Sequence, residues 1–231
     1  MNANDKQRTA TGYDEVEAEI ARACKASRRA PADVELVAVS KTRAADAIVP
    51  LLERGHRAFG ENRVQEAQGK WPALRERWPD AQLHMIGQLQ SNKADDAVAL
   101  FDAIHALDRP SLLKALAKAM DKADRRVPCF VQVDVGEEPQ KGGCAVADLP
   151  AFLAKARDAD IPVAGLMCLP PAGIEPAPFF ALLAKLAADN GVAGKPMGLS
   201  MGMSSDFATA VMLGATHIRV GTALFGAREE V

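Results

Sequence analysis

Residues 34–41 read VELVAVSK, a short apolar run that alternates in polarity, contains several β-branched side chains and stops at Lys41. Such alternation over a few residues is typical of a β-strand. Lysine normally keeps its ammonium group in water, so a strand that carries this amine to its own carboxyl end is unusual. Lys41 is therefore a candidate reactive residue, and a strand-end lysine that extends into solvent is the alternative.

Strand-like and helix-like segments alternate outward from this run along nearly the whole chain. Further strands are expected at 57–61, 82–88, 102–107, 129–135, 162–169, 196–201 and 216–221. Helical patterns are expected at 11–29, 44–54, 63–77, 92–99, 110–124, 146–158, 176–190 and 205–213. Alternating β and α segments with short connections predict a parallel sheet.

Eight strands with a helix after nearly every one, in about 200 residues, predict a compact (β/α)8 TIM barrel. An open, doubly wound sheet is the alternative, but no expected strand is followed by the G-x-G-x-x-G turn of a dinucleotide-binding half. The sequence contains no internal repeat, low-complexity tract or linker. We therefore expect residues 1–231 to form a single domain, with an N-terminal helix within residues 1–30 packed on the barrel.

The composition argues against several classes of protein. Of the 231 residues, 48% are hydrophobic and 25% are charged, as in ordinary globular proteins. The formal net charge is −2 and basic residues are interspersed with acidic ones, so we expect no nucleic-acid partner. The N-terminus lacks an apolar signal segment, and no uninterrupted apolar run approaches the ~20 residues of a membrane span.

The four cysteines form no C-x-x-C pair and have no histidine partner at metal-ligand spacing; they are Cys24, Cys129, Cys144 and Cys168. This pattern is typical of reduced thiols in a cytoplasmic protein, with two of the four expected to be buried and no metal site.

Two polar, glycine-containing segments near the C-terminus resemble phosphate-binding turns: SMGMSSD at 200–206 and RVGTALFG at 219–226. In (β/α)8 barrels phosphate often binds the loops after the seventh and eighth strands. Glycine lets the backbone approach phosphate oxygens, and the start of a following helix supplies unpaired N–H groups. The candidate phosphate-binding residues are Ser200, Ser204, Gly221 and Thr222. A serine that only caps a helix, and glycines that only turn the chain, are the alternative.

An amine at one strand end and a phosphate site at two others predict pyridoxal 5′-phosphate (PLP) held as a Schiff base. Arg219 interrupts the apolar pattern of the last expected strand, and a buried arginine must find an acceptor because its charge cannot be discarded. The pyridine nitrogen of PLP is one candidate and a structural carboxylate is the other. FGEN at 59–62 ends the second expected strand, so we expect Asn62 over the site and Glu61 paired with a nearby base.

Several segments, in this order, resemble the pyridoxal phosphate homeostasis family: AVSKTR (38–43), FGENRVQE (59–66), HMIGQLQSNK (84–93), GLM (165–167), LSMGMSSD (199–206) and IRVGTALFG (218–226). The resemblance implies a barrel like the N-terminal domain of alanine racemase. It also implies PLP on Lys41, its phosphate at Ser204, Gly221 and Thr222, and Arg219 at the ring nitrogen. Members of this family are thought to hold and deliver PLP, with PLP-dependent apoenzymes as recipients, without an established catalytic reaction.

A PLP-dependent amino-acid racemase on the same barrel is the rival function. Racemisation needs a proton acceptor on each face of the substrate α-carbon, and Lys41 can serve only one. In the racemases that this fold resembles, the second acceptor is a tyrosine from an additional C-terminal domain. The chain ends five residues after Gly226 and its only tyrosine is Tyr13, so we expect no racemase activity and a monomer. A barrel that binds another phosphorylated metabolite without a Schiff base is the third possibility.

Overall fold

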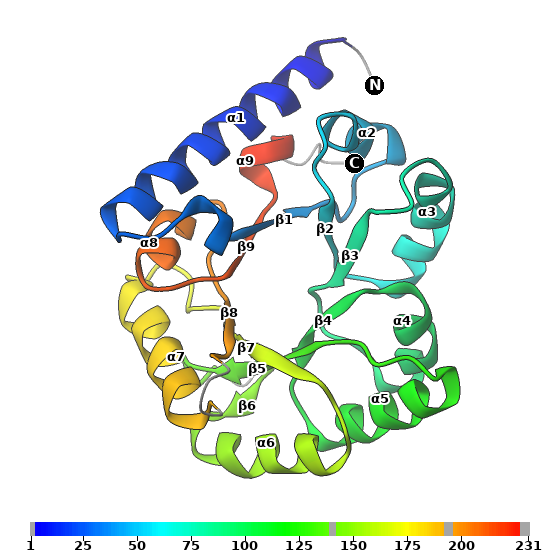
Figure 1. The fold of residues 1–231 in the computed structure, drawn as a ribbon, viewed down its shortest axis with the longest axis vertical. Coiled ribbons are helices and arrows are strands. Elements are labelled where there is room, and N and C mark those ends of the chain that lie inside the picture. The colour runs from blue at the N-terminus through cyan, green and yellow to red at the C-terminus, as the bar shows by residue number, and fades with distance from the viewer. Residues whose placement is uncertain (1–2, 139–141, 192–195, 227–231) are drawn as a thin grey trace.

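The computed structural model describes residues 3–138, 142–191 and 196–226 (Figure 1). Its parallel strands are β1 (Glu35–Val39), β2 (Ala58–Glu61), β3 (Gln82–Met85), β4 (Ala103–Leu107), β5 (Cys129–Asp134), β7 (Val163–Met167), β8 (Gly198–Ser200) and β9 (His217–Val220). They follow the order β4-β3-β2-β1-β9-β8-β7-β5, and β4 also pairs with β5. This last pairing closes the sheet into an eight-stranded barrel, which excludes the open doubly wound sheet.

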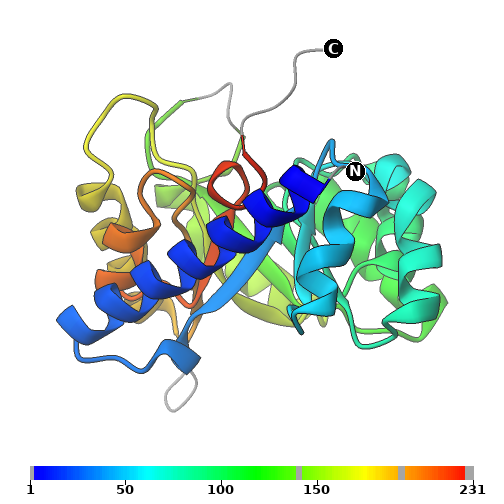
Figure 2. The ribbon, with the colours of Figure 1, turned by 90° about the horizontal axis from the view of Figure 1, so that it is seen from above.

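Helices surround the barrel (Figure 1). They are α1 (Ala3–Ala26), α2 (Ala45–Glu53), α3 (Val64–Arg77), α4 (Ala94–Leu100), α5 (Pro110–Ala123), α6 (Leu149–Asp158), α7 (Ala177–Asn190), α8 (Phe207–Met212) and α9 (Thr222–Phe225). Short 3-10 turns lie at Pro31–Asp33, Ser91–Lys93 and Val146–Asp148. Figure 2 shows α1 lying across α9, α8 and α2 on the outside of the barrel.

Local patterns account for these elements. In α5 an apolar stripe at helical spacing is buried against the sheet: Leu112, Leu113, Leu116 and Met120. In β1 the side chains alternate between the two faces: Leu36 and Ala38 belong to the core between barrel and helices, whereas Val37 lies beside Gly60 inside the barrel. Most of the buried apolar residues of the described chain form one continuous core around the barrel.

The predicted barrel is therefore confirmed, and each end of the eight expected strands lies within three residues of its predicted position. Three details differ. A two-residue strand, β6 (Cys144–Ala145), pairs with β5, and the expected turn after β9 contains the short helix α9. Helix α1 begins at Ala3 rather than near residue 11; Thr9 is buried in its first part but polar, so an apolar pattern does not reveal this part of the helix.

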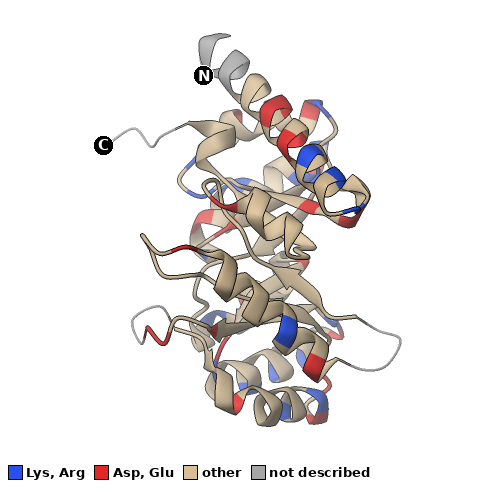
Figure 3. Ribbon diagram, turned by 90° about the vertical axis from the view of Figure 1, so that its left-hand side faces the viewer, with Lys and Arg blue, Asp and Glu red and all other residues tan. Residues whose placement is uncertain are grey.

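Charged residues of both signs are distributed over the surface. On the side of the molecule drawn in Figure 3, basic and acidic residues are mixed over the helices, without a zone of one sign. No helix in the described part of the chain is long and apolar enough to cross a membrane. Within the same residues, no group of three or more histidine, cysteine or acidic side chains could hold a metal ion. All four cysteines are free and buried, which corrects the expectation of two.

Candidate functional site

Lys41 and Asn62 end neighbouring strands at the same level of the barrel. Val39 of β1 lies opposite Gly60 of β2, and Lys41 and Asn62 each follow two residues later. Both side chains are half-buried. Strand β1 ends at Val39, and Lys41 lies in the turn that follows it at the barrel mouth.

The end of β9 lies on the other side of β1. Ala38 is opposite Val220, so Gly221 leaves the barrel beside Val39. A Cβ atom on Gly221 would lie 3.3 Å from Val39 Cβ and 3.4 Å from its carbonyl oxygen, closer than most side chains tolerate. Thr222 follows as the first residue of α9 and is exposed. The two turns predicted to hold the amine and the phosphate are therefore adjacent.

Ser204 joins the turn after β8 to the turn after β9. Its Oγ accepts hydrogen bonds from the backbone N–H groups of Gly221 and Ala223, each at 3.3 Å. Helix α8 begins after Asp206, whose carboxylate accepts the N–H of Met203, so Ser204 does not cap α8. A hydroxyl and two N–H groups thus meet at one point, and an anion bound there would replace the Ser204 oxygen as the acceptor of the two N–H groups.

Glycine is required at position 202 in the same turn. Gly202 has a φ of +94°, a conformation that disfavours other residues. An added Cβ would also lie 2.6 Å from Ala210 Cβ. The close packing of this turn on α8 therefore depends on the missing side chain.

Arg219 is buried inside the barrel, where it donates to Ser200 Oγ at 2.6 Å and to the carbonyl oxygen of Cys168 at 3.0 Å. Neither acceptor is a carboxylate, and burial lowers the pKa of the guanidinium. Because Ser200 accepts from Arg219, its own proton is left for His105 Nδ1, 2.7 Å away. His105 Nε2 in turn lies 3.0 Å from His84 Nδ1.

His84 and His105, the two histidines in this series of hydrogen bonds, are disfavoured in their charged forms by burial. Burial lowers the pKa of His84 to about 4 and that of His105 well below its ordinary value. If Ser200 donates to His105 Nδ1, then His105 must carry its proton on Nε2 and donate it to His84. This hydrogen-bond chain holds Arg219 in place without a second charge. The sequence alone did not reveal it, because its members are far apart along the chain.

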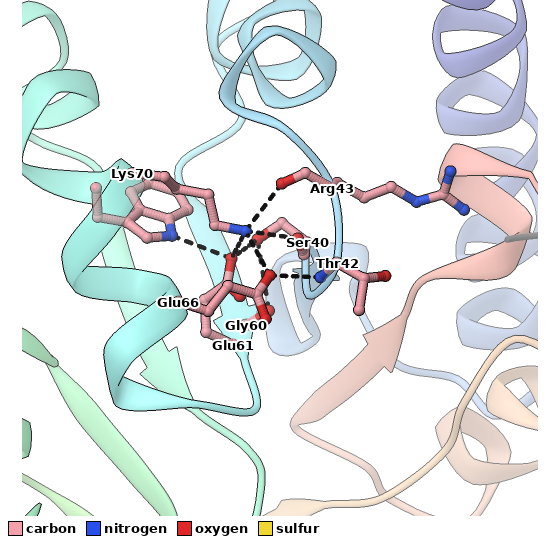
Figure 4. Close-up of polar contacts among 8 residues, drawn as sticks. Ser40, Thr42, Arg43, Gly60, Glu61, Glu66 and Lys70 are labelled. Atoms are coloured by element: carbon pink, nitrogen blue, oxygen red, sulfur yellow. Dashed lines mark hydrogen bonds and ion pairs between the residues drawn. The ribbon is translucent and has the colours of Figure 1, made fainter. Parts of the chain in front are cut away.

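Glu61 pairs with Lys70 of α3, 2.7 Å away, as predicted for a nearby base (Figure 4). The sequence predicted that Glu61 has a basic partner, but not that this partner is Lys70 or that Lys70 also contacts the turn containing Lys41. One feature of the sequence pointed to Lys70 as an ion-pair residue: it lies four residues after Glu66 within an expected helix.

A cavity of about 850 Å³ opens at the carboxyl ends of β2, β3 and β4. Of the predicted site residues, Asn62 lines it, together with Gln88, Asp108 and Arg109. The structure thus pairs Ser200 with Arg219, and Ser204 with Gly221. Lys41 lies on the adjacent strand end, and Asn62 lies toward the cavity.

These residues fit a ligand with a phosphate at one end and a carbonyl group at the other. N–H and hydroxyl donors converge beside Gly221, where a Cβ atom would be tightly packed, and Lys41 follows the end of the neighbouring strand. Arg219 of β9 adds a buried guanidinium whose two acceptors, Ser200 Oγ and the carbonyl oxygen of Cys168, include no carboxylate.

Comparisons with known proteins identify the relatives of this chain. The family profile of the alanine racemase N-terminal domain matches residues 15–229. The chain is 38% identical over 221 residues to the pyridoxal phosphate homeostasis protein of Pseudomonas aeruginosa, covering 93% of each chain. It is 34% identical to the protein of that name from Escherichia coli K12, covering 87% of this chain and 88% of the other.

Solved structures with a similar fold include a protein of similar sequence and a more distant alanine racemase. PipY of Synechococcus elongatus, solved without PLP, is 40% identical with a TM-score of 0.81, over 90% of this chain and all of that one. Its structure with PLP bound superposes with a TM-score of 0.80. Alanine racemase of Clostridium difficile 630 has a TM-score of 0.72 over 97% of this chain and 58% of that one, at 12% identity, and shares the fold.

Proposed function

This chain belongs to the family of pyridoxal phosphate homeostasis proteins, and from that premise we propose that it binds PLP at the carboxyl mouth of its barrel and serves intracellular PLP (vitamin B6) homeostasis. The observation that carries the proposal is the meeting of β1 and β9. There the turn that contains Lys41 lies beside Gly221, whose N–H is hydrogen-bonded to Ser204 in the turn after β8; these groups are the proposed phosphate donors.

Each predicted residue has a role in this proposal. The amine of Lys41 condenses with an aldehyde, forming a C=N bond and releasing one water, and it does so in its neutral form. Ser204, Gly221 and Thr222 hold the phosphate, and Asn62 orients the ring from the β2 side. Bound PLP supplies the aldehyde for this Schiff base and a ring that can withdraw electrons.

Arg219 and Ser200 set the electronic state of the ring in this proposal. A guanidinium facing the pyridine nitrogen donates to it and so keeps it unprotonated, whereas a carboxylate would favour the pyridinium. An unprotonated ring is the weaker electron sink, which suits holding PLP rather than removing a proton from an amino acid. Arg219 is held for this role by Ser200 Oγ.

Carrier function is favoured over racemisation for a second reason. Racemisation needs a proton acceptor on each face of the substrate. The one tyrosine of the sequence, Tyr13, packs in the outer layer, against the ring of His56 and under the guanidinium of Arg54. We propose that the protein holds PLP and delivers it to PLP-dependent apoenzymes, as a monomer. Its four free, buried cysteines suit the reducing cytoplasm.

The visible absorption spectrum of the purified protein with PLP tests the proposal. We expect a Schiff-base band in the visible region, and borohydride reduction should place the added mass on the peptide that contains Lys41. Lys41→Ala should abolish that adduct while leaving weaker, phosphate-anchored binding. Lys185→Ala is the matched control, because Lys185 is an exposed lysine of α7 paired with Asp189. A wild-type protein without band or adduct would overturn PLP binding, and an adduct on another lysine would overturn the role of Lys41.

A further inference from the structure

One buried ammonium group holds both ends of the turn that carries Lys41. Lys70 Nζ donates to the carbonyl oxygen of Ser40 at 2.9 Å and to that of Arg43 at 3.0 Å (Figure 4). These two carbonyls immediately precede Lys41 and follow Thr42. The distance between them is therefore set by a side chain from α3, outside the barrel, and not only by the turn itself.

Two carboxylates hold Lys70 in this position. Its ammonium lies 2.7 Å from Glu61 Oε1 and 3.1 Å from Glu66 Oε1, and its side chain is 9% exposed. Glu61 Oε1 also accepts from Ser40 Oγ at 2.6 Å and from Trp71 Nε1 at 3.1 Å. Burial raises the pKa of Glu61, and the hydrogen bonds from Lys70, Ser40 and Trp71 oppose the rise.

The residue after Lys41 adopts a conformation that needs such support. Thr42 has a φ of +62°, in the left-handed region that β-branched residues avoid. Its N–H donates to the Glu66 carboxylate, the same oxygen that accepts from Lys70. Glu66 therefore stabilises an unfavourable backbone conformation directly beside the reactive amine, and it links that conformation to Lys70.

We propose that Lys70, together with Glu61 and Glu66, is a positioning group that presets the Lys41 turn before any ligand binds. The inference rests on the proposed function, since Lys41 is the residue whose amine would bond to PLP. A preset turn lowers the entropy lost when the amine is held at one place. Lys70 acts through the backbone, because both of its acceptors on the turn are carbonyl oxygens.

The test compares Lys70→Met with Lys185→Met, an exposed lysine of α7 paired with Asp189. In the PLP-free protein, hydrogen exchange of the Thr42 amide should accelerate roughly tenfold or more in Lys70→Met. This factor corresponds to the loss of one hydrogen bond from the Lys70 ammonium to the backbone of the turn. PLP retention, followed by the visible band, should weaken by a similar factor, and the position of the band should shift. Lys185→Met should match the wild type in all three measurements.

A second pair of variants keeps the test decisive if Lys70→Met does not fold. Glu66 is 27% exposed, so its replacement is tolerated more readily. Glu66→Gln keeps an oxygen that accepts the Thr42 N–H and should retain slow exchange and most PLP binding, whereas Glu66→Ala should lose both. A lower melting temperature with unchanged Thr42 exchange and PLP retention would show a purely structural network and overturn the inference.

The two proposals fail differently. A wild-type protein that forms no adduct with PLP would refute the proposed function. The exchange rate of the Thr42 amide would then still decide whether Lys70 and Glu66 preset the turn.

Discussion

Thr222 marks the point at which the last strand reaches the barrel mouth. Its backbone follows Gly221, which is held against Val39, and its side chain is exposed. The neighbouring N–H groups of Gly221 and Ala223 already point to one oxygen, that of Ser204. A hydroxyl at position 222 can thus contribute to ligand binding while contributing little to the core.

Replacing Thr222 with leucine should separate these two contributions. We expect PLP retention to fall roughly tenfold through the loss of one hydrogen bond to a charged group. The free energy of unfolding should change by no more than about 0.5 kcal/mol, as for other exposed positions. Equilibrium dialysis with PLP and urea denaturation of the PLP-free protein measure the two effects. Thr222→Ser keeps the hydroxyl and should bind normally; if retention and stability fell together in Thr222→Leu, the turn would be structural instead.

At the level of elements, α1 holds α9 in place. An added Cβ on Gly12 of α1 would lie 2.4 Å from the carbonyl oxygen of Ala223 and 3.1 Å from that of Leu224. The two helices therefore touch through their backbones, as Figure 2 shows for their overall arrangement. Since α9 directly follows the Gly221 turn, the N-terminal helix controls where the proposed phosphate donors lie.

Gly12→Ala should therefore affect both stability and PLP binding. The added methyl group must push α1 and α9 apart, and such overpacking costs about 1–3 kcal/mol. PLP retention should weaken as the N–H groups of the turn move. Gly69→Ala is the matched control: Gly69 is an exposed glycine within α3 with no atom within 4 Å of an added Cβ. That variant should gain about 0.5–1 kcal/mol from helix propensity and bind PLP normally. Normal binding and stability in Gly12→Ala would show that the two helices can separate freely.

At the level of the whole molecule, the barrel encloses a polar interior. His105 and His217 lie against Phe130, and His84 lies beside both of these histidines, with ring centroids 4.3–6.3 Å apart. His217 also pairs with Glu35 at 3.0 Å, and that hydrogen bond lowers the pKa of Glu35. Arg219 is the one charge on the hydrogen-bond chain that runs from Ser200 through His105 to His84.

This interior makes stability depend on pH. Burial lowers the pKa of His84 from 6.5 to about 4, so the unfolded chain takes up a proton below pH 6.5 while the folded protein resists until about pH 4. The stability from this residue is complete above pH 6.5 and is lost as the pH falls toward 4. His105 is shifted in the same direction. Between pH 7.5 and 5 we expect a loss of roughly 2 kcal/mol from His84, and a further loss of the same sign from His105.

Urea denaturation of the PLP-free protein at the two pH values measures this loss. His84→Gln removes one titrating group and should make stability less sensitive to acid than in the wild type. A wild-type protein with equal stability at pH 7.5 and pH 5 would show that these histidines titrate normally.

The positions of the strands and of the candidate site were largely predictable. Alternation in VELVAVSK and the helical stripes of segments such as α5 depend on neighbours along the chain, so they can be read directly from the sequence. Parallel strands place their carboxyl ends at one edge, which was enough to place Lys41 and Gly221 together. The start of α1 was missed because Thr9 is a polar residue in a buried stripe.

The sequence by itself determined the (β/α)8 class, the family, and the strand ends that carry the candidate residues. Only the tertiary structure decided that Lys70 is the partner of Glu61, that Ser200 and His105 support Arg219, and that α1 lies against α9. The reason is physical. Periodicity is a local property of the chain, whereas these contacts join residues far apart in sequence, and they exist only after register and barrel closure bring their side chains within hydrogen-bonding distance.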